Sequence, residues 1–176
     1  MRQLSFRAFH SYAEKLHNQA LEAATDAGAM PYLIGSILTS WMSLESFVNN
    51  MMQDFTTLPE RTFSVHERGF LEEKQVQFIR KGDEAGKFSM GNAPEYKRIE
   101  DKILFLVAKF GGGKVDKGGQ LWQKFDSVKK KRNALSHYRR DSDIELTSQD
   151  SQEAMDLAKE LIEFLSKKVW KKPLKW

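Results

Sequence analysis

The sequence predicts an all-α fold, an antiparallel bundle of five to six helices formed by one domain over residues 1–176. Apolar residues recur at a spacing of three to four along nearly the whole chain, as on the buried face of a helix. No apolar/polar alternation typical of a strand exceeds four residues. Glycine or proline separates most of the periodic segments. A length of 176 residues and a mass of 20.3 kDa suit one domain, or at most two small ones.

Three helices are expected in the first half of the chain. The first covers residues 5–27 and the second covers residues 31–55, with glycine and proline between them. The third covers residues 64–81. Its start is indicated by Ser64 followed three residues later by Glu67, the pattern of a capping box.

The second half of the chain alternates loops rich in glycine with three further helices. A polar loop is expected at residues 82–93, and a fourth helix at residues 94–110 begins with a proline. Residues 111–119, GGGKVDKGG, hold five glycines and therefore predict a flexible loop. The fifth helix covers residues 120–140. The sixth covers residues 148–169, where apolar residues again recur every three to four positions.

The composition excludes several kinds of site. The chain contains no cysteine, which excludes disulfides, thiolate catalysis and zinc sites built on cysteine. His10 and His17 lie about 10.5 Å apart along the first helix, too far to share a metal ion, and we expect them at the surface or boundary of the bundle. We therefore expect no metal and no other cofactor. The net charge of +4 is a weak indication of a polyanionic partner.

We expect no membrane association and a cytoplasmic location. The N-terminal residues lack the apolar segment of a signal peptide. The longest uncharged run, residues 27–44, has the length of a membrane span. It also contains a proline, two glycines and four serine or threonine residues, so we interpret it as a buried helix.

Two charged residues fall on apolar helix faces. At 100° per residue, Glu45 lies about 40° from Trp41, inside the apolar stripe of the second helix. Arg132 lies about 20° from Leu121, inside the apolar stripe of the fifth helix. An arginine cannot lose its charge, and a desolvated carboxylate needs a partner. The two positions therefore predict that Glu45 and Arg132 meet in or near the core.

The fifth helix also carries most of the positive charge. Residues 124–140 contain seven basic residues and one acidic residue, a net charge of +6, whereas the whole chain carries +4. Such runs commonly form a solvated face, but here the run shares a helix with the misplaced arginine and with His137. We interpret the segment as an anion-binding surface. Its basic residues are Lys124, Lys129, Lys130, Lys131, Arg132, Arg139 and Arg140.

Arg132 and His137 are separated by four residues, which places them about 140° apart on a helix. One helix therefore cannot easily direct both side chains at one phosphate. Two copies related by a two-fold axis can do so in a shared cleft, and we therefore expect a homodimer. Arg61 and His66 have the same spacing, but they straddle a loop and a capping box without a basic helix around them, so we set that pair aside.

The segment RNALSH at residues 132–137, followed by a last amphipathic helix, resembles the HEPN superfamily of α-helical nucleases. The segment SWMSLESFVNN at residues 40–50 places Glu45 where these bundles often carry an acidic residue near the arginine. Asn133 matches the polar residue that commonly follows the motif arginine. The resemblance covers residues 5–169, of which the six-residue motif is the specific part. It implies a homodimeric, metal-independent endoribonuclease of the kind found in toxin–antitoxin, phage-defence and RNA-processing systems.

In such a site each residue has a chemical role. His137 can act as general base or acid, because histidine titrates near neutral pH. Arg132 offers a bidentate donor fork to the phosphate, and Glu45 orients it. Asn133 positions a phosphate oxygen or the histidine. The products expected are 2′,3′-cyclic phosphate and 5′-hydroxyl ends. The residues expected to hold the RNA backbone are Lys129, Lys130, Arg139 and Arg140.

Two other interpretations remain open. The bundle can bind RNA or a nucleotide without cleaving it, with Arg132 and His137 contacting phosphate only. Alternatively, Glu45 and Arg132 form an inert ion pair in a structural or adaptor protein. Besides RNA and a second copy of the chain, an antitoxin or other partner protein is expected for the leading interpretation.

Overall fold

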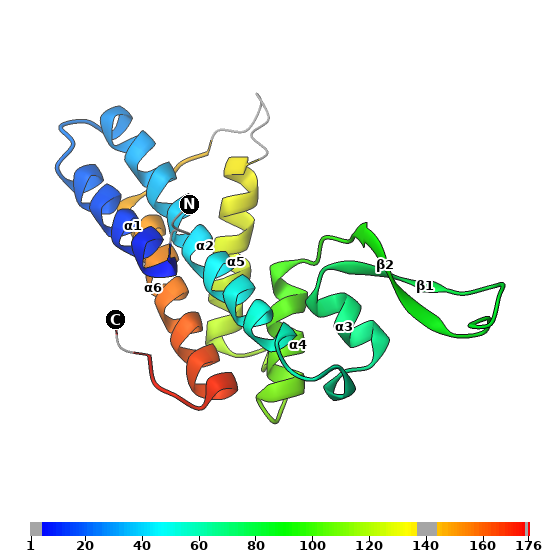
Figure 1. Ribbon diagram of the computed structural model, residues 1–176. Helices are drawn as coiled ribbons and strands as arrows, with labels where there is room; N and C mark the ends of the chain where they lie inside the picture. Colours follow the sequence, from blue (N-terminus) through cyan, green and yellow to red (C-terminus); the bar gives the residue numbers. More distant parts are fainter. Residues whose placement is uncertain (1–4, 137–143, 175) are drawn as a thin grey trace. The chain divides into compact units, whose positions relative to one another are not determined.

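The computed structural model describes residues 5–136, 144–174 and 176 (Figure 1). The described part of the chain is mostly helical, with six α-helices, two short η segments and one two-stranded sheet. It divides into two compact units. One unit combines residues 1–47 with residues 107–176, and the other consists of residues 48–106.

The first unit is a helical bundle. It contains α1 (Phe6–Leu21), most of α2 (Asp26–Thr56), α5 (Gln120–Ser136) and α6 (Ser148–Leu165), which is followed by the π-helical segment η2 (Ser166–Trp170). In Figure 1, α6 lies beside both α1 and α5, with which it makes most of its contacts. Large apolar side chains from α2, α5 and α6 fill the core. Those with almost no exposure include Ile37, Leu44, Phe47, Phe125, Leu161 and Ile162.

Side-chain hydrogen bonds fix the starts of two of these helices. Ser5 caps α1 by accepting a hydrogen bond from the backbone N–H of Ala8. Thr147 and Asp150 form a capping box at the start of α6, in which each side chain accepts from the backbone N–H of the other residue. These bonds satisfy amide groups that a helix leaves unpaired in its first turn.

The second unit combines short helices with a hairpin. After the last residues of α2 come η1 (Glu60–Thr62), α3 (Val65–Leu71), β1 (Lys74–Phe78), β2 (Phe88–Pro94) and most of α4 (Ile99–Phe110). The strands are antiparallel, with Val76 opposite Met90 and Phe78 opposite Phe88.

The expected helix over residues 64–81 is wrong beyond its first two turns. The predicted capping box between Ser64 and Glu67 is present, but α3 ends at Leu71. Glu73 then takes a left-handed backbone conformation with φ of 51°, which reverses the chain into β1. The segment expected as a loop supplies β2 and the connection before it. There Gly82 and Gly86 have φ values of 86° and 88°, which glycine adopts readily.

Other helix boundaries also differ from expectation. α2 begins at Asp26, so Pro31 lies inside its N-terminal part, and α4 begins at Ile99 because the residues before it belong to β2 or to a connection. His10 and His17 are buried, with 6% and 9% exposure, and not at the surface. No helix in the described residues is long and apolar enough to cross a membrane.

The contact between α3 and β1 depends on Gly69. A Cβ atom at this position would lie 2.5 Å from Val76 Cγ2 and 3.0 Å from the backbone oxygen of Lys74. We expect Gly69→Ala to destabilise the second unit by about 1–3 kcal/mol, because a backbone atom cannot move aside cheaply. Urea unfolding measures this. The control is Gly113→Ala, where no atom lies within 4 Å; equal losses in both variants would contradict the prediction.

Candidate functional site

The predicted meeting of Glu45 and Arg132 is confirmed. α2 supplies Glu45 and α5 supplies Arg132, and the distance between Glu45 Oε1 and Arg132 Nη2 is 3.7 Å. Both residues lie within the helical bundle of the first unit. The pair therefore joins two helices far apart in the sequence, as expected for charges on facing packing surfaces.

Trp41 holds both members of this pair. Its indole N–H donates a 2.7 Å hydrogen bond to Glu45 Oε1, one helical turn further along α2. The guanidinium carbon of Arg132 lies 5.8 Å from the centroid of the Trp41 ring, a cation–π distance. The same indole stacks on Phe125 of α5, with ring centroids 5.5 Å apart. Trp41 thus fixes the carboxylate and supports the arginine from a buried position, with 4% exposure.

Sequence reasoning placed Trp41 only in the apolar stripe. The spacing of Trp41 and Glu45 indicates that the indole can hydrogen-bond the carboxylate, since residues four apart lie next to each other on a helix. A buried indole N–H also requires an acceptor, and Glu45 is such an acceptor on the same helix face.

The pair is half-buried and therefore lies near the core, as expected, and not inside it. The side chains of Arg132 and Glu45 retain 30% and 28% exposure. Part of each side chain is therefore open to solvent. Since solvent screens a pair of this exposure, its contribution to stability is small.

Asn133 lies beside Arg132 and is exposed. Its side-chain oxygen accepts a 3.2 Å hydrogen bond from Nη1 of Arg132. Asn133 and Glu45 thus engage different nitrogens of one guanidinium group. The remaining predicted residues of the motif and its basic flank, His137, Arg139 and Arg140, lie outside the described residues.

The positive charge of α5 is largely compensated by carboxylates. Lys124 pairs with Glu160 of α6 at 2.7 Å. Lys129 pairs with Asp126 at 3.1 Å and lies 5.4 Å from the ring centroid of Phe125. Together with Arg132, three of the five basic residues described in α5 thus have acidic partners.

Lys131 is a fourth basic residue with acidic partners. Its ammonium group pairs with Asp150 at 2.5 Å and with Glu153 at 2.8 Å. Lys130 is exposed and makes no ion pair within the described part of the chain. The expected anion-binding surface therefore contains much less free positive charge than its sequence indicates.

The Lys131 ion pairs shift the pKa values of their members. Burial lowers the pKa of Lys131, but hydrogen bonds to Asp150 and Glu153 outweigh burial, and the net shift is upward. Burial raises the pKa of Asp150, but hydrogen bonds from Lys131 and from Thr147 outweigh it, and the net shift is downward. Lys131 and Asp150 thus each stabilise the charged form of the other.

The described residues contain no group of three or more His, Asp or Glu side chains arranged to hold a metal ion. Comparison of the chain with protein-family models, with curated proteins and with solved structures finds no match.

The pKa shifts predict a pH-dependent stabilisation by the Lys131 cluster. Because the pKa of Asp150 is lower in the folded state, its contribution is complete above the unfolded value of about 4 and is lost as the pH falls below it. We expect Lys131→Met to lower the free energy of unfolding by about 0.5–1 kcal/mol at neutral pH and by less near pH 2.5.

Urea unfolding at the two pH values measures the effect. The matched control is Lys130→Met, which removes an adjacent lysine with no carboxylate partner in the described residues. A loss of stability in Lys131→Met that is the same at both pH values would contradict the role of Asp150.

Proposed function

We propose that this protein is a metal-independent endoribonuclease, with Arg132 as the phosphate-binding residue and His137 as the general acid or base. The observation that carries the proposal is the setting of Arg132. The guanidinium group is held by a carboxylate and an indole, and the side chain that carries it is 30% exposed, so Arg132 is both oriented and partly open to solvent. Donors fixed in advance in this way stabilise the charge that develops on phosphorus during cleavage.

The remaining groups have roles that follow from their chemistry. Glu45 and Trp41 position Arg132 and do not touch the RNA. Asn133, exposed beside the guanidinium, is suited to donate its amide N–H to a second phosphate oxygen. His137 removes the proton of the 2′-hydroxyl or protonates the leaving 5′-oxygen. No step in this scheme requires a metal ion.

The proposal includes a homodimer. Arg132 and His137 lie about 140° apart if the helix continues through the motif, so each phosphate is best met by residues of two copies. The resemblance to HEPN nucleases extends the proposal to a toxin–antitoxin or phage-defence setting, in which an antitoxin or other partner protein restrains the activity.

The compensated charge of α5 limits how RNA is held. In the described residues, Lys130 is exposed and unpaired with a carboxylate, whereas Lys129 is paired with Asp126. We therefore assign the backbone contacts to Lys130, Arg139 and Arg140, with a smaller part for Lys129. Binding should depend only modestly on salt, because few phosphates are neutralised.

The second candidate is a structural protein in which the Glu45–Arg132 pair only joins two helices. The observation that favours it is the pairing of most basic residues of α5 with acidic partners. The two candidates differ in the effect of Arg132→Ala. A structural protein does not cleave RNA, and Arg132→Ala changes only its stability. A nuclease cleaves RNA, and Arg132→Ala abolishes cleavage while the protein stays folded.

Cleavage of single-stranded RNA in EDTA tests the nuclease directly. We expect Arg132→Ala and His137→Ala each to reduce the cleavage rate at least about a hundredfold, since each removes a group that acts in the transition state. The products should carry 2′,3′-cyclic phosphates, and DNA of the same sequence should stay intact because it lacks the 2′-hydroxyl. Gel electrophoresis with mass spectrometry of the ends measures both.

Arg61 and His66 provide a matched control, because they have the same four-residue spacing in a different part of the chain. Arg61→Ala and His66→Ala should leave cleavage unchanged. If both Arg132→Ala and His137→Ala still cleave RNA at the normal rate, neither residue takes part in the reaction.

The shared cleft is tested by oligomeric state and by mixing. Sedimentation at about tens of micromolar should give twice the chain mass of 20.3 kDa. Mixing the inactive Arg132→Ala and His137→Ala variants should restore part of the activity, because a mixed dimer retains one arginine and one histidine. A monomer at this concentration would contradict the two-copy site.

A further inference from the structure

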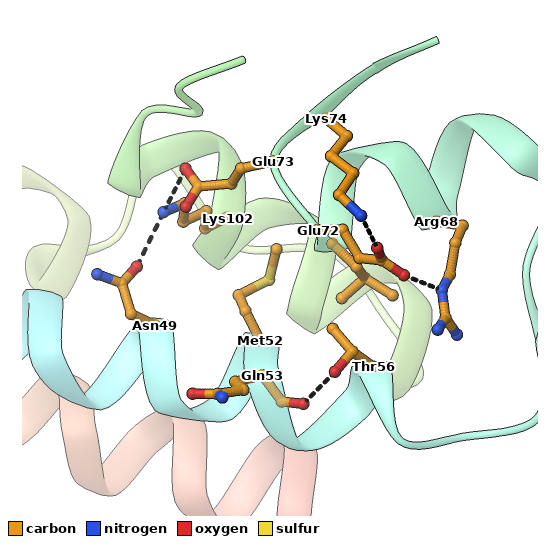
Figure 2. A pocket seen from close by; sticks show the side chains of 10 residues that line it. Asn49, Met52, Gln53, Thr56, Arg68, Glu72, Glu73, Lys74 and Lys102 are labelled. Atoms are coloured by element: carbon orange, nitrogen blue, oxygen red, sulfur yellow. Dashed lines mark hydrogen bonds and ion pairs between the residues drawn. The ribbon is translucent and has the colours of Figure 1, made fainter. Parts of the chain in front are cut away.

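The second unit contains a polar cavity whose lining does not include Arg132, and the inference drawn from it is independent of the function proposed above. Its volume is about 550 Å³, within the range of small-molecule sites. Its lining residues come from the end of α2, from α3 and the turn after it, from the start of β1 and from α4. Figure 2 shows these side chains grouped around Met52.

A buried lysine forms one wall of the cavity. Lys102 of α4 has 4% exposure, and its ammonium group lies 2.8 Å from Asn49 Oδ1 and 2.8 Å from Glu73 Oε1 (Figure 2). Glu73 also accepts a hydrogen bond from the backbone N–H of Lys97 at 3.0 Å. Burial raises the pKa of Glu73, but these bonds outweigh it and the pKa is lowered. Glu73 therefore stays ionised, and Lys102 and Glu73 compensate each other.

The second carboxylate is shared between two cations. Glu72 accepts from Nε of Arg68 through one oxygen and from Lys74 at 2.9 Å through the other (Figure 2). The hydrogen bond from Lys74 is the main cause of the lowered pKa of Glu72. The cavity lining holds three cations and two carboxylates. Lys102 is paired with Glu73, so Arg68 and Lys74 share the single carboxylate of Glu72. One positive charge is therefore left for a ligand.

The cavity also has hydrogen-bond donors in excess. The carboxylate oxygens of Glu72 and Glu73 face Arg68, Lys74 and Lys102. Asn49 Oδ1 accepts from Lys102, so the side-chain amide nitrogen of Asn49 adds a further donor to those of the three cations. A ligand that brings acceptor oxygens and negative charge, as a carboxylate or a phosphate does, therefore suits this lining.

The size of the cavity indicates what can carry the negative charge. Met52 and Leu71 are buried and expose little apolar surface to a ligand, with 3% and 4% exposure. The volume of about 550 Å³ is much more than an inorganic ion occupies, and it suits an anion attached to a small organic body. We propose that this cavity binds a small organic anion, namely a carboxylate or phosphate monoester.

Isothermal titration calorimetry with three probes of similar size tests the proposal: benzoate, phenyl phosphate and benzyl alcohol, in low-salt buffer. We expect saturable binding of at least one of the two anions and none of the neutral alcohol. Binding of benzoate or of phenyl phosphate shows whether the anionic group that the cavity takes is a carboxylate or a phosphate. Saturation by neither anion up to about 10 mM, or equal binding of the alcohol, would overturn the proposal.

Variants link the binding to this cavity. Lys74→Met should weaken the anion about tenfold, whereas Lys87→Met should change it less than about twofold. Lys87 is the matched control because it also pairs with a glutamate, Glu84, at 2.9 Å in the same unit, but does not line the cavity. Equal weakening in the two variants would overturn the assignment to this cavity.

A third variant separates ligand binding from a merely structural ion-pair network. Glu72→Gln removes the carboxylate that competes for Arg68 and Lys74, so the anion should bind several-fold more tightly. A structural network gives no reason for tighter binding. Thermal unfolding confirms that each variant is folded, and unchanged or weaker binding in folded Glu72→Gln would overturn the proposal.

Discussion

A charged side chain on a packing face of a helix must meet a partner of opposite charge there, and much of this structure depends on that constraint. The ion pair of Glu45 and Arg132 is one example. Desolvating an unpaired ion costs several kcal/mol, more than most single contacts contribute. Helix α5 can pack on α2 because Glu45 lies 3.7 Å from Arg132 and because Trp41 accommodates both. A half-buried position reduces that cost further, since part of each ion keeps its water.

The same constraint organises other contacts in each unit. In the bundle, Lys131 of α5 meets Asp150 and Glu153 of α6, and Asp150 at the same time caps the helix that carries it. In the second unit, the buried Lys102 of α4 meets Glu73, which follows α3. Pairs of this kind specify which helix faces meet even where they add little stability. They leave less charge for external partners than the sequence alone indicates.

The sequence was sufficient to predict features that the residue pattern of individual helices indicates. Ser64 and Glu67 form the predicted capping box, and the wheel positions of Glu45 and Arg132 predicted their contact. It was insufficient where the cause is a distant segment. The carboxylate partners of Lys124 and Lys131 lie about twenty or more residues away on α6, so the sequence does not show that these lysines are paired. Strand β1 was not predicted, because its conformation depends on pairing with β2. The apolar/polar alternation of a strand of five residues is also too short to indicate a strand by itself.

The pairing of Arg132 also bears on whether a phosphate is merely bound or is transformed there. A carboxylate next to the guanidinium weakens its attraction for any anion, so a site selected for binding alone gains nothing from Glu45. A catalytic site gains from it, because rate depends on stabilising the transition state more than the ground state. A donor fork held in one orientation by Glu45 and Trp41 meets the extra charge on phosphorus without reorganising. In the nuclease proposed above, the same lowered affinity lets the cleaved product leave. The arrangement around Arg132 therefore favours the proposed cleavage over the alternative of RNA binding alone.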